Sequence, residues 1–316
     1  MLKPLLVVAG PTASGKTGLA VELARRLDGE IVSADSRQIY RRLDIGTAKP
    51  TAGEQSMAAH HLLDIIDVSE SFSAGLFAAA AREAIKRIRG TGKTPIVCGG
   101  TGFYIEALCS PMFEEPEVDP ARKKQVRAEL ARDAETLGRA EIHRRLEAVD
   151  PQSAARLHPN DLQRVSRALE VYCLTGRTLS ELHGEAQTKP DFAPYMILLD
   201  PPLDEHDRRI AERTGAMFDA GWEVEVRDLL AGCVPEDAPG FESLGYAEII
   251  SLVRGRTGRD EAAANIVRST CRYARRQRTW FNTREAALRD DPRKLSIGDI
   301  ESGWRKYQHK QGEGTG

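Results

Sequence analysis

A glycine-rich segment near the N-terminus has the residue types needed to hold a phosphate group. Residues 10–17 read Gly-Pro-Thr-Ala-Ser-Gly-Lys-Thr and match the P-loop pattern G-x-x-x-x-G-K-[ST]. They follow an apolar run at 5–9 that predicts a strand, and they open a predicted helix at 15–27. Backbone N–H groups at the helix N-terminus provide partial positive charge, Lys16 adds a full charge, and the Thr17 hydroxyl can hold Mg²⁺. The segment predicts a diphosphate or triphosphate ligand, bound by Gly10, Pro11, Thr12, Ala13, Ser14, Gly15, Lys16 and Thr17.

Asp35 is a second candidate site residue, at the carboxyl end of a predicted strand at 31–34. Open parallel sheets bind ligands at this edge, so we expect the carboxylate to face the phosphate segment. Its role is open between a general base, a group that organises ribose or Mg²⁺, and a cap for the next segment. The reaction is open as well, because the same cradle serves ATP hydrolysis, phosphoryl transfer and reactions in which diphosphate leaves.

Thr101 is a third candidate, in the sequence Gly-Gly-Thr-Gly at 99–102 that follows a predicted strand at 94–98. The surrounding glycines leave its hydroxyl room to reach a ligand at the same sheet edge. The alternative is a glycine-rich turn whose threonine caps the following helix.

The elements that must position these residues alternate between strand and helix. This alternation predicts a parallel α/β sheet with both faces covered by helices. An acidic, proline-rich stretch after Pro111 predicts a domain junction, residues 121–185 are helical and Arg-rich, and the apolar run 196–202 returns the chain to the sheet. We therefore predict a P-loop NTPase-like α/β core at 1–115 and 190–310, an inserted all-helical subdomain at 116–189, and a disordered tail at 311–316.

Composition excludes several classes of protein. The 316 residues are 41% hydrophobic and 29% charged, which fits a globular chain and neither a disordered nor a membrane protein. Five scattered cysteines form no C-x-x-C pair, so they predict neither a disulfide framework nor a zinc site and favour a reducing, cytoplasmic location. No feature suggests an obligate partner chain, and we expect a monomer.

Several further strings carry a family resemblance over about residues 5–285. Besides 10–17 and 99–104, they include Asp-Ser-Arg-Gln-Ile-Tyr at 35–40, Asp-Ile-Gly-Thr-Ala-Lys-Pro at 44–50 and His-His-Leu-Leu-Asp at 60–64. Beyond the insertion the match continues at 158–171, 221–227, 245–246 and 275–281. With these strings in this order, the chain resembles the tRNA dimethylallyltransferase (tRNA isopentenyltransferase) family.

The resemblance implies a reaction and a role for each candidate. A dimethylallyl group moves from dimethylallyl diphosphate to N6 of the adenosine just 3′ of the anticodon, tRNA position 37, and diphosphate leaves. Asp35 would be the general base, and Thr101 would bind near the bridging oxygen and the incoming amine. Lys16, Arg227 and Mg²⁺ on Thr17 would neutralise the departing diphosphate.

The same resemblance implies a set of tRNA contacts. Asn160 and Asp161 could instead cap the following helix, and Arg275 and Arg276 could belong to a solvated helix face. Near 120 the family's arginine corresponds to Arg127, Arg122 or Lys123, of which helical register favours Arg127. The implied contacts are Asp35, Ser36, Arg37, Gln38, Thr101, Arg127, Asn160, Asp161, Gln163, Arg164, Arg167, Arg272, Arg275, Arg276 and Gln277.

Net charge alone argues against a nucleic-acid partner, since the formal charge is −2. Its distribution argues the other way, because residues 254–284 carry nine arginines against Asp260 and Glu261, a local charge of +7 that leaves −9 elsewhere. An arginine-dense segment on an otherwise acidic chain is typical of a protein that binds one RNA element. Three alternatives remain: a small-molecule kinase, a dimethylallyltransferase acting on free AMP or ATP, and a non-catalytic RNA-binding module.

Overall fold

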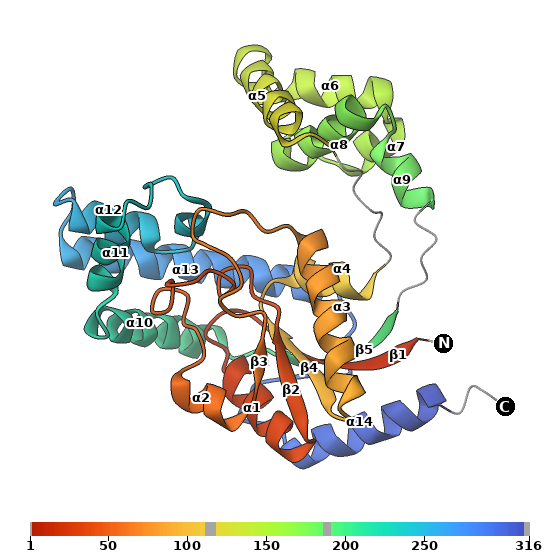
Figure 1. The fold of residues 1–316 in the computed structure, drawn as a ribbon, viewed down its shortest axis with the longest axis vertical. Coiled ribbons are helices and arrows are strands. Elements are labelled where there is room, and N and C mark those ends of the chain that lie inside the picture. The colour runs from red at the N-terminus through yellow and green to blue at the C-terminus, as the bar shows by residue number, and fades with distance from the viewer. Residues whose placement is uncertain (1, 111–117, 186–190, 313–316) are drawn as a thin grey trace. The chain divides into compact units, whose positions relative to one another are not determined.

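The chain forms two compact units in a computed structural model that describes residues 2–110, 118–185 and 191–312 (Figure 1). The core unit comprises Met1–Ser110 and Pro190–Gly316, and the helical unit comprises Pro111–Lys189. The second unit is therefore inserted into the first along the chain, and each is described below by itself.

A parallel sheet forms the centre of the core unit. Within the described residues it has six strands in the order β3-β2-β4-β1-β5-β6, and every neighbouring pair is parallel. The strands are β1 Lys3–Ala9, β2 Gly29–Ser33, β3 His60–His61, β4 Thr94–Gly99, β5 Phe192–Leu199 and β6 Leu288–Asp290. This confirms the predicted fold class. The sequence did not indicate β3 and β6, because these short edge strands have no apolar run.

Helices cover both faces of the sheet, as continuous apolar strands require. Leu6 and Val8 of β1 share a core cluster with helix α1, Lys16–Arg26, and with Ile300 and Trp304 of helix α14, Ile297–Gly312. Helix α3, Ala74–Gly90, and helix α4, Gly102–Cys109, contact each other and the strands from the other face. The predicted tail is wrong at its start, because residues 311 and 312 end α14; residues 313–316 lie outside the described residues.

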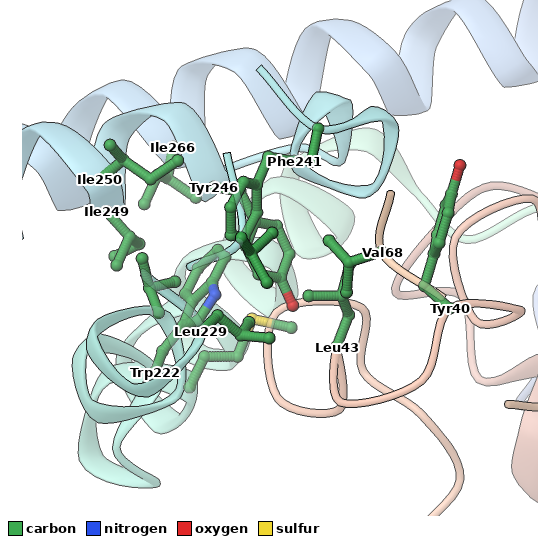
Figure 2. Packing of buried hydrophobic residues seen from close by; sticks show 14 of the residues in the cluster. Tyr40, Leu43, Val68, Trp222, Leu229, Phe241, Tyr246, Ile249, Ile250 and Ile266 are labelled. Carbon is green, nitrogen blue, oxygen red and sulfur yellow. The ribbon is translucent and has the colours of Figure 1, made fainter. Parts of the chain in front are cut away.

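A second core cluster joins the C-terminal helices to the segment that follows β2. Trp222 and Tyr246 are fully buried at its centre, with ring centroids 5.5 Å apart, and Leu43 and Val68 reach them from the earlier segment (Figure 2). The helices of this cluster are α10 Leu203–Asp219, α11 Trp222–Ala231, the 3-10 helix Pro239–Glu242, α12 Tyr246–Val253 and α13 Arg259–Asn282. Helix α2, Ala52–Met57, contacts α1.

Gly245 must be glycine for Trp222 to pack in this way. Its φ is +90°, and an added Cβ would lie 2.1 Å from the Trp222 ring. We expect Gly245→Ala to lower the free energy of unfolding by about 1–3 kcal/mol, because the core would be overpacked. Urea unfolding measures this. The control is Gly215→Ala inside α10, where an added Cβ meets nothing within 4 Å and helix propensity predicts a gain of up to about 1 kcal/mol. Equal unfolding free energies for the two variants would contradict the packing argument.

The helical unit has its own core. Val126, Ile142, Leu146 and Val165 are fully buried against one another, and the described residues 118–185 form helices and no strand. Asp150 is buried and accepts hydrogen bonds from the backbone N–H of Ser153 at 3.0 Å and from the Ser180 hydroxyl at 2.6 Å. The helices are α5 Pro120–Leu137, α6 Arg139–Val149, α7 Pro151–Arg156, α8 Leu162–Thr175 and α9 Leu179–Glu185.

Candidate active site

A cleft of about 660 Å³ lies at the carboxyl edge of the sheet in the core unit. Its lining includes Lys16 and Thr17 after β1, Asp35 after β2, and Gly99 and Gly100 after β4. These three segments meet because β2, β4 and β1 are neighbours in the sheet, with Ser33 paired to Cys98 and Ala9 paired to Gly99. The phosphate segment and Asp35, predicted separately from the sequence, therefore share one cavity.

The phosphate segment has the geometry of an anion cradle. Gly15 adopts φ +90° immediately before α1, which turns the backbone into the helix N-terminus. The Ser14 side chain is fully buried, and its hydroxyl has no hydrogen-bond partner within the described part of the chain. A buried hydroxyl needs a partner, and a phosphate oxygen would provide one. Lys16 Nζ donates a 2.7 Å hydrogen bond to the Pro11 carbonyl.

The pKa of Lys16 predicts a pH dependence for diphosphate binding. Burial lowers the pKa of Lys16 to about 8. Below this pH the ammonium is charged and attracts the anion; above it, a proton must be taken up before the charge is available. We therefore expect the contribution of Lys16 to pyrophosphate affinity to fall as the pH rises through about 8, with uptake by Lys16 of about half a proton at pH 8 and almost none at pH 6. Pyrophosphate exchanges protons of its own in this pH range, and the control variant measures that exchange.

Calorimetry in buffers of different ionisation enthalpy measures this proton uptake. Lys16→Arg is the control, because an arginine at this position stays charged at these pH values. The difference in proton uptake between the wild type and this variant is the part that belongs to Lys16. Equal proton uptake in Lys16→Arg and the wild type would assign the uptake to pyrophosphate or to another group of the protein.

A hydrogen-bonded turn fixes the orientation of the Asp35 carboxylate. Its Oδ1 accepts a hydrogen bond from the backbone N–H of Arg37 at 2.9 Å. The Thr101 hydroxyl accepts a 3.0 Å hydrogen bond from the backbone N–H of Ser36 and donates a 3.3 Å bond to its side chain. Thr101 precedes α4 without a side-chain cap bond, and it is not among the residues that line the cleft. Its hydroxyl therefore supports the turn that carries Asp35.

Arg227 is not where the sequence analysis expected it. It is exposed on α11 and does not line the cleft. Arg209 and Arg213 of α10 line the cleft instead, and Arg213 Nη2 donates a 2.6 Å hydrogen bond to the Thr12 hydroxyl. Burial lowers the pKa of Arg213, and Asp35 opposes that shift. Arg213 therefore takes the place of Arg227 as the candidate residue at the phosphate segment. The available signal was the four-residue spacing of Arg209 and Arg213 on a predicted helix.

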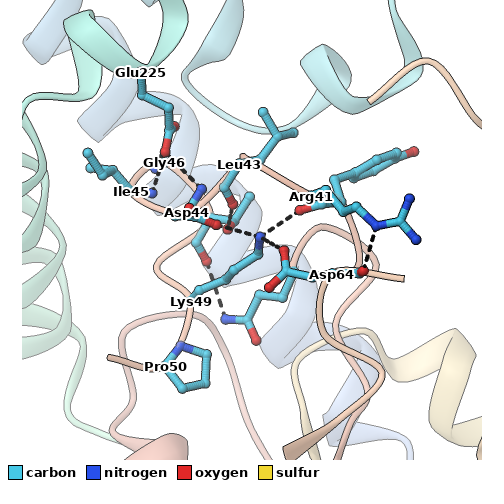
Figure 3. Close-up of polar contacts among 12 residues, drawn as sticks. Arg41, Leu43, Asp44, Ile45, Gly46, Lys49, Pro50, Asp64 and Glu225 are labelled. Atoms are coloured by element: carbon cyan, nitrogen blue, oxygen red, sulfur yellow. Dashed lines mark hydrogen bonds and ion pairs between the residues drawn. The ribbon is translucent and has the colours of Figure 1, made fainter. Parts of the chain in front are cut away.

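A loop at 44–50 forms another wall of the cleft and is fixed by charged groups from distant segments (Figure 3). Glu225 of α11 accepts hydrogen bonds from the backbone N–H groups of Asp44 at 2.8 Å and Ile45 at 2.7 Å. The Lys49 ammonium is buried and donates to the Asp44 carboxylate at 2.6 Å and to the Asp64 carboxylate. These contacts join three strings that carried the family resemblance, at 44–50, 60–64 and 221–227. The sequence analysis had assigned no role to Asp44, Lys49, Asp64 or Glu225.

Two glutamines predicted to contact tRNA are engaged within the protein. Gln38 lines the cleft, and its amide nitrogen donates to the Ala48 carbonyl at 2.9 Å. Gln277 is buried, and its amide accepts from the Thr12 backbone N–H at 2.8 Å and donates to the Gly100 carbonyl at 2.7 Å. Both side chains therefore hold the walls of the cleft.

Three arginines of α13 are among the residues predicted to contact tRNA. Arg272, Arg275 and Arg276 are exposed, and Arg276 also lines the cleft, with its guanidinium 5.7 Å from the Tyr273 ring centroid. Arg275 pairs with Asp207 at 2.7 Å. The structure therefore brings Arg276 to the cavity that contains Ser36, Arg37 and Asp35.

The other predicted contacts lie in the helical unit. Asp161 caps α8, accepting a 3.3 Å hydrogen bond from the backbone N–H of Arg164, as its structural alternative proposed. Asn160, Gln163 and Arg164 are exposed around this cap. Arg127 Nε pairs with the buried carboxylate of Glu170 at 2.9 Å, and Arg167 pairs with the same carboxylate at 3.0 Å.

Other features bear on what the chain can bind. All five cysteines are free. His61 pairs with Glu30 at 2.7 Å, and the described residues contain no cluster of three or more His, Cys, Asp or Glu side chains able to hold a metal. No helix in the described ranges has the length and apolarity needed to cross a membrane.

The fold and the cleft define a P-loop α/β protein in which the arginine-rich helix α13 lies beside the phosphate segment. The model of the IPP transferase family matches residues 38–284. The chain is 47% identical to the tRNA dimethylallyltransferase of Sorangium cellulosum, over 90% of this chain and 89% of that protein. It is 49% identical to that of Anaeromyxobacter dehalogenans strain 2CP-C, over 88% of this chain and 91% of that protein. The chain belongs to the IPP transferase family.

Solved structures agree with this assignment. The tRNA isopentenylpyrophosphate transferase of Bacillus halodurans superposes with a TM-score of 0.70 at 33% identity, covering 98% of this chain and 99% of that chain. A eukaryotic dimethylallyltransferase acting on tRNA superposes with a TM-score of 0.75 at 27% identity, covering 88% and 70%.

Proposed function

We propose that this protein transfers the dimethylallyl group of dimethylallyl diphosphate to N6 of the adenosine at tRNA position 37, forming N6-dimethylallyladenosine and releasing diphosphate. The observation that carries the proposal is the shared cleft, which is lined by Asp35, by Lys16 of the phosphate segment and by Arg276 of α13. In such a cleft, one group of residues can bind a diphosphate and another group can bind an RNA base. We expect the enzyme to act as a monomer in the cytoplasm.

The chemistry assigns one task to each group. The N6 amine of adenosine attacks C1 of the dimethylallyl group, and the new C–N bond forms as the C1–O bond to diphosphate breaks. The diphosphate leaves with the electron pair, and Asp35 takes the proton released by the amine. An exocyclic adenine amine is a weak nucleophile, so a base positioned at this proton lowers the barrier.

Positive groups stabilise the leaving diphosphate. The backbone N–H groups of the phosphate segment, Lys16 and Arg213 surround the place where its charge develops. Mg²⁺ fits this site through the Thr17 hydroxyl and the ligand's own phosphate oxygens, since phosphate-bound Mg²⁺ needs few protein ligands; when bound, it neutralises part of the diphosphate charge. Thr101 acts in this proposal through Ser36, which it holds beside Asp35.

RNA contacts complete the proposal. Ser36, Arg37 and Arg276 line the cleft, and Arg272 and Arg275 extend the basic surface along α13. In the helical unit we propose that Asn160, Gln163, Arg164 and Arg127 contact the same tRNA. The target adenine must leave its stack to reach the Asp35 carboxylate inside the cleft.

The test is nucleoside analysis of tRNA after incubation with the protein, Mg²⁺ and labelled dimethylallyl diphosphate. We expect label in N6-dimethylallyladenosine at position 37. Parallel reactions with AMP, and with labelled ATP in place of the diphosphate, separate the alternatives. Label in AMP alone, or phosphate transfer from ATP, would overturn the proposal, and tRNA binding without any transfer would indicate a non-catalytic RNA-binding protein.

A further inference from the structure

One residue of α13 touches two catalytic loops at once. The Gln277 side chain is 8% exposed, and both ends of its amide are used. Its oxygen accepts a 2.8 Å hydrogen bond from the backbone N–H of Thr12 in the phosphate segment. Its nitrogen donates a 2.7 Å hydrogen bond to the carbonyl of Gly100 in the glycine loop at 99–102. Both hydrogen bonds span long intervals of sequence, so the tertiary fold alone creates this bridge.

The surroundings are shaped around this bridge. A Cβ added at Gly100 would lie 2.6 Å from the Gln277 amide nitrogen, so the glycine leaves the space that the amide occupies. Three residues further along the same helix, Trp280 packs so closely on Gly102 that an added Cβ there would lie 2.3 Å from its ring. One face of α13 therefore packs against the glycine loop over about one helical turn.

The carbonyl and the hydroxyl of Thr12 also form hydrogen bonds within the protein. His206 bonds to the Thr12 carbonyl at 2.7 Å, and Arg213 donates to the Thr12 hydroxyl at 2.6 Å. Gln277 accepts the remaining hydrogen bond, from the Thr12 backbone N–H. Of these three partners, Gln277 is the one whose side chain also bonds to the glycine loop. Gln277 lines the cleft, but the oxygen and the nitrogen of its amide are both engaged within the protein.

We propose that Gln277 is a positioning residue that holds the phosphate segment and the glycine loop at a fixed spacing, and that it does not contact tRNA. The proposal rests on the proposed function only for its turnover readout. It predicts that losing the bridge weakens diphosphate binding and slows transfer, because the cradle N–H groups lose their preorganised geometry. RNA affinity, which we assign to the exposed arginines of α13, should be preserved.

The experiment compares Gln277→Met with the wild-type protein, using inorganic pyrophosphate and an anticodon stem-loop RNA as separate probes. We expect the pyrophosphate Kd to rise about tenfold, as for a buried N–H left without its acceptor, and the RNA Kd to stay within about twofold. In turnover, kcat should fall while KM for tRNA is unchanged. Gln308→Met, the same substitution at an exposed glutamine of α14, is the matched control and should change neither affinity.

The opposite pattern, with weaker RNA binding and unchanged pyrophosphate binding, would overturn the proposal, as would equal loss of both affinities in a cooperatively folded variant. Because pyrophosphate binding needs no transfer, a failure of the proposed function and a failure of this inference are distinguishable.

Gly100→Ala disturbs the same contact at the glycine loop. It tests the proposal if Gln277→Met does not fold. We expect it to weaken pyrophosphate binding several-fold in the wild-type background and to have little effect in Gln277→Ala, where the obstructing amide is gone. An equal effect in both backgrounds would show that the two residues are not coupled and would overturn the proposal.

Discussion

Asp35→Asn is expected to reduce dimethylallyl transfer by about 10²–10⁴-fold, the range attributed to general base catalysis, while RNA and pyrophosphate affinities stay close to wild type. The substitution keeps the size of the side chain and an oxygen that can accept the Arg37 N–H, so the turn is preserved. It removes the basic oxygen that would take the N6 proton. Single-turnover kinetics with prebound tRNA isolate this step from binding.

Asp67→Asn is a matched control for this prediction. Asp67 also accepts a hydrogen bond from the backbone N–H two residues ahead, that of Ser69 at 3.1 Å, but it does not line the cleft. We expect its transfer rate to be unchanged. If Asp35→Asn lowered RNA affinity as much as turnover, Asp35 would be a binding residue, and the base would have to be sought elsewhere in the cleft.

Arg213→Gln is expected to lower the transfer rate by about 10²-fold and to weaken pyrophosphate binding, whereas Arg227→Gln should leave both within about twofold. The physical reason is position. Arg213 reaches the phosphate segment through Thr12, where negative charge develops on the leaving group, while Arg227 is exposed on α11 and lies outside the cleft lining. A charge in water is too well screened to replace one inside the cavity.

The two arginine variants form a direct comparison, because each removes one guanidinium from a neighbouring helix of the same unit. Turnover with saturating tRNA and pyrophosphate titration by calorimetry measure the effect. A larger loss in Arg227→Gln than in Arg213→Gln would restore the assignment made from the family resemblance and would require α11 to rearrange when substrate binds.

Local patterns were sufficient for the parts of the site that each lie on one segment. The phosphate segment is one strand-loop-helix unit, and its glycines and Lys16 have their roles wherever that unit occurs. Asp35 and the glycine loop follow strands of continuous apolar sequence, so their place at the sheet edge follows from parallel topology. The density of arginines at 254–284 indicated a basic segment, but it did not show that Gln277 turns inward.

Sequence by itself determined the fold class, the phosphate segment, the sheet-edge position of Asp35 and the presence of an inserted helical unit, because each depends on residues close together along the chain. Tertiary structure alone decided which arginine reaches the cleft, which glutamines are buried, and that Glu225 and Lys49 fix the loop at 44–50. These contacts join segments separated by many residues. They depend on how helices dock against the sheet, and that docking is set by the packing of whole side-chain surfaces, which no local pattern encodes.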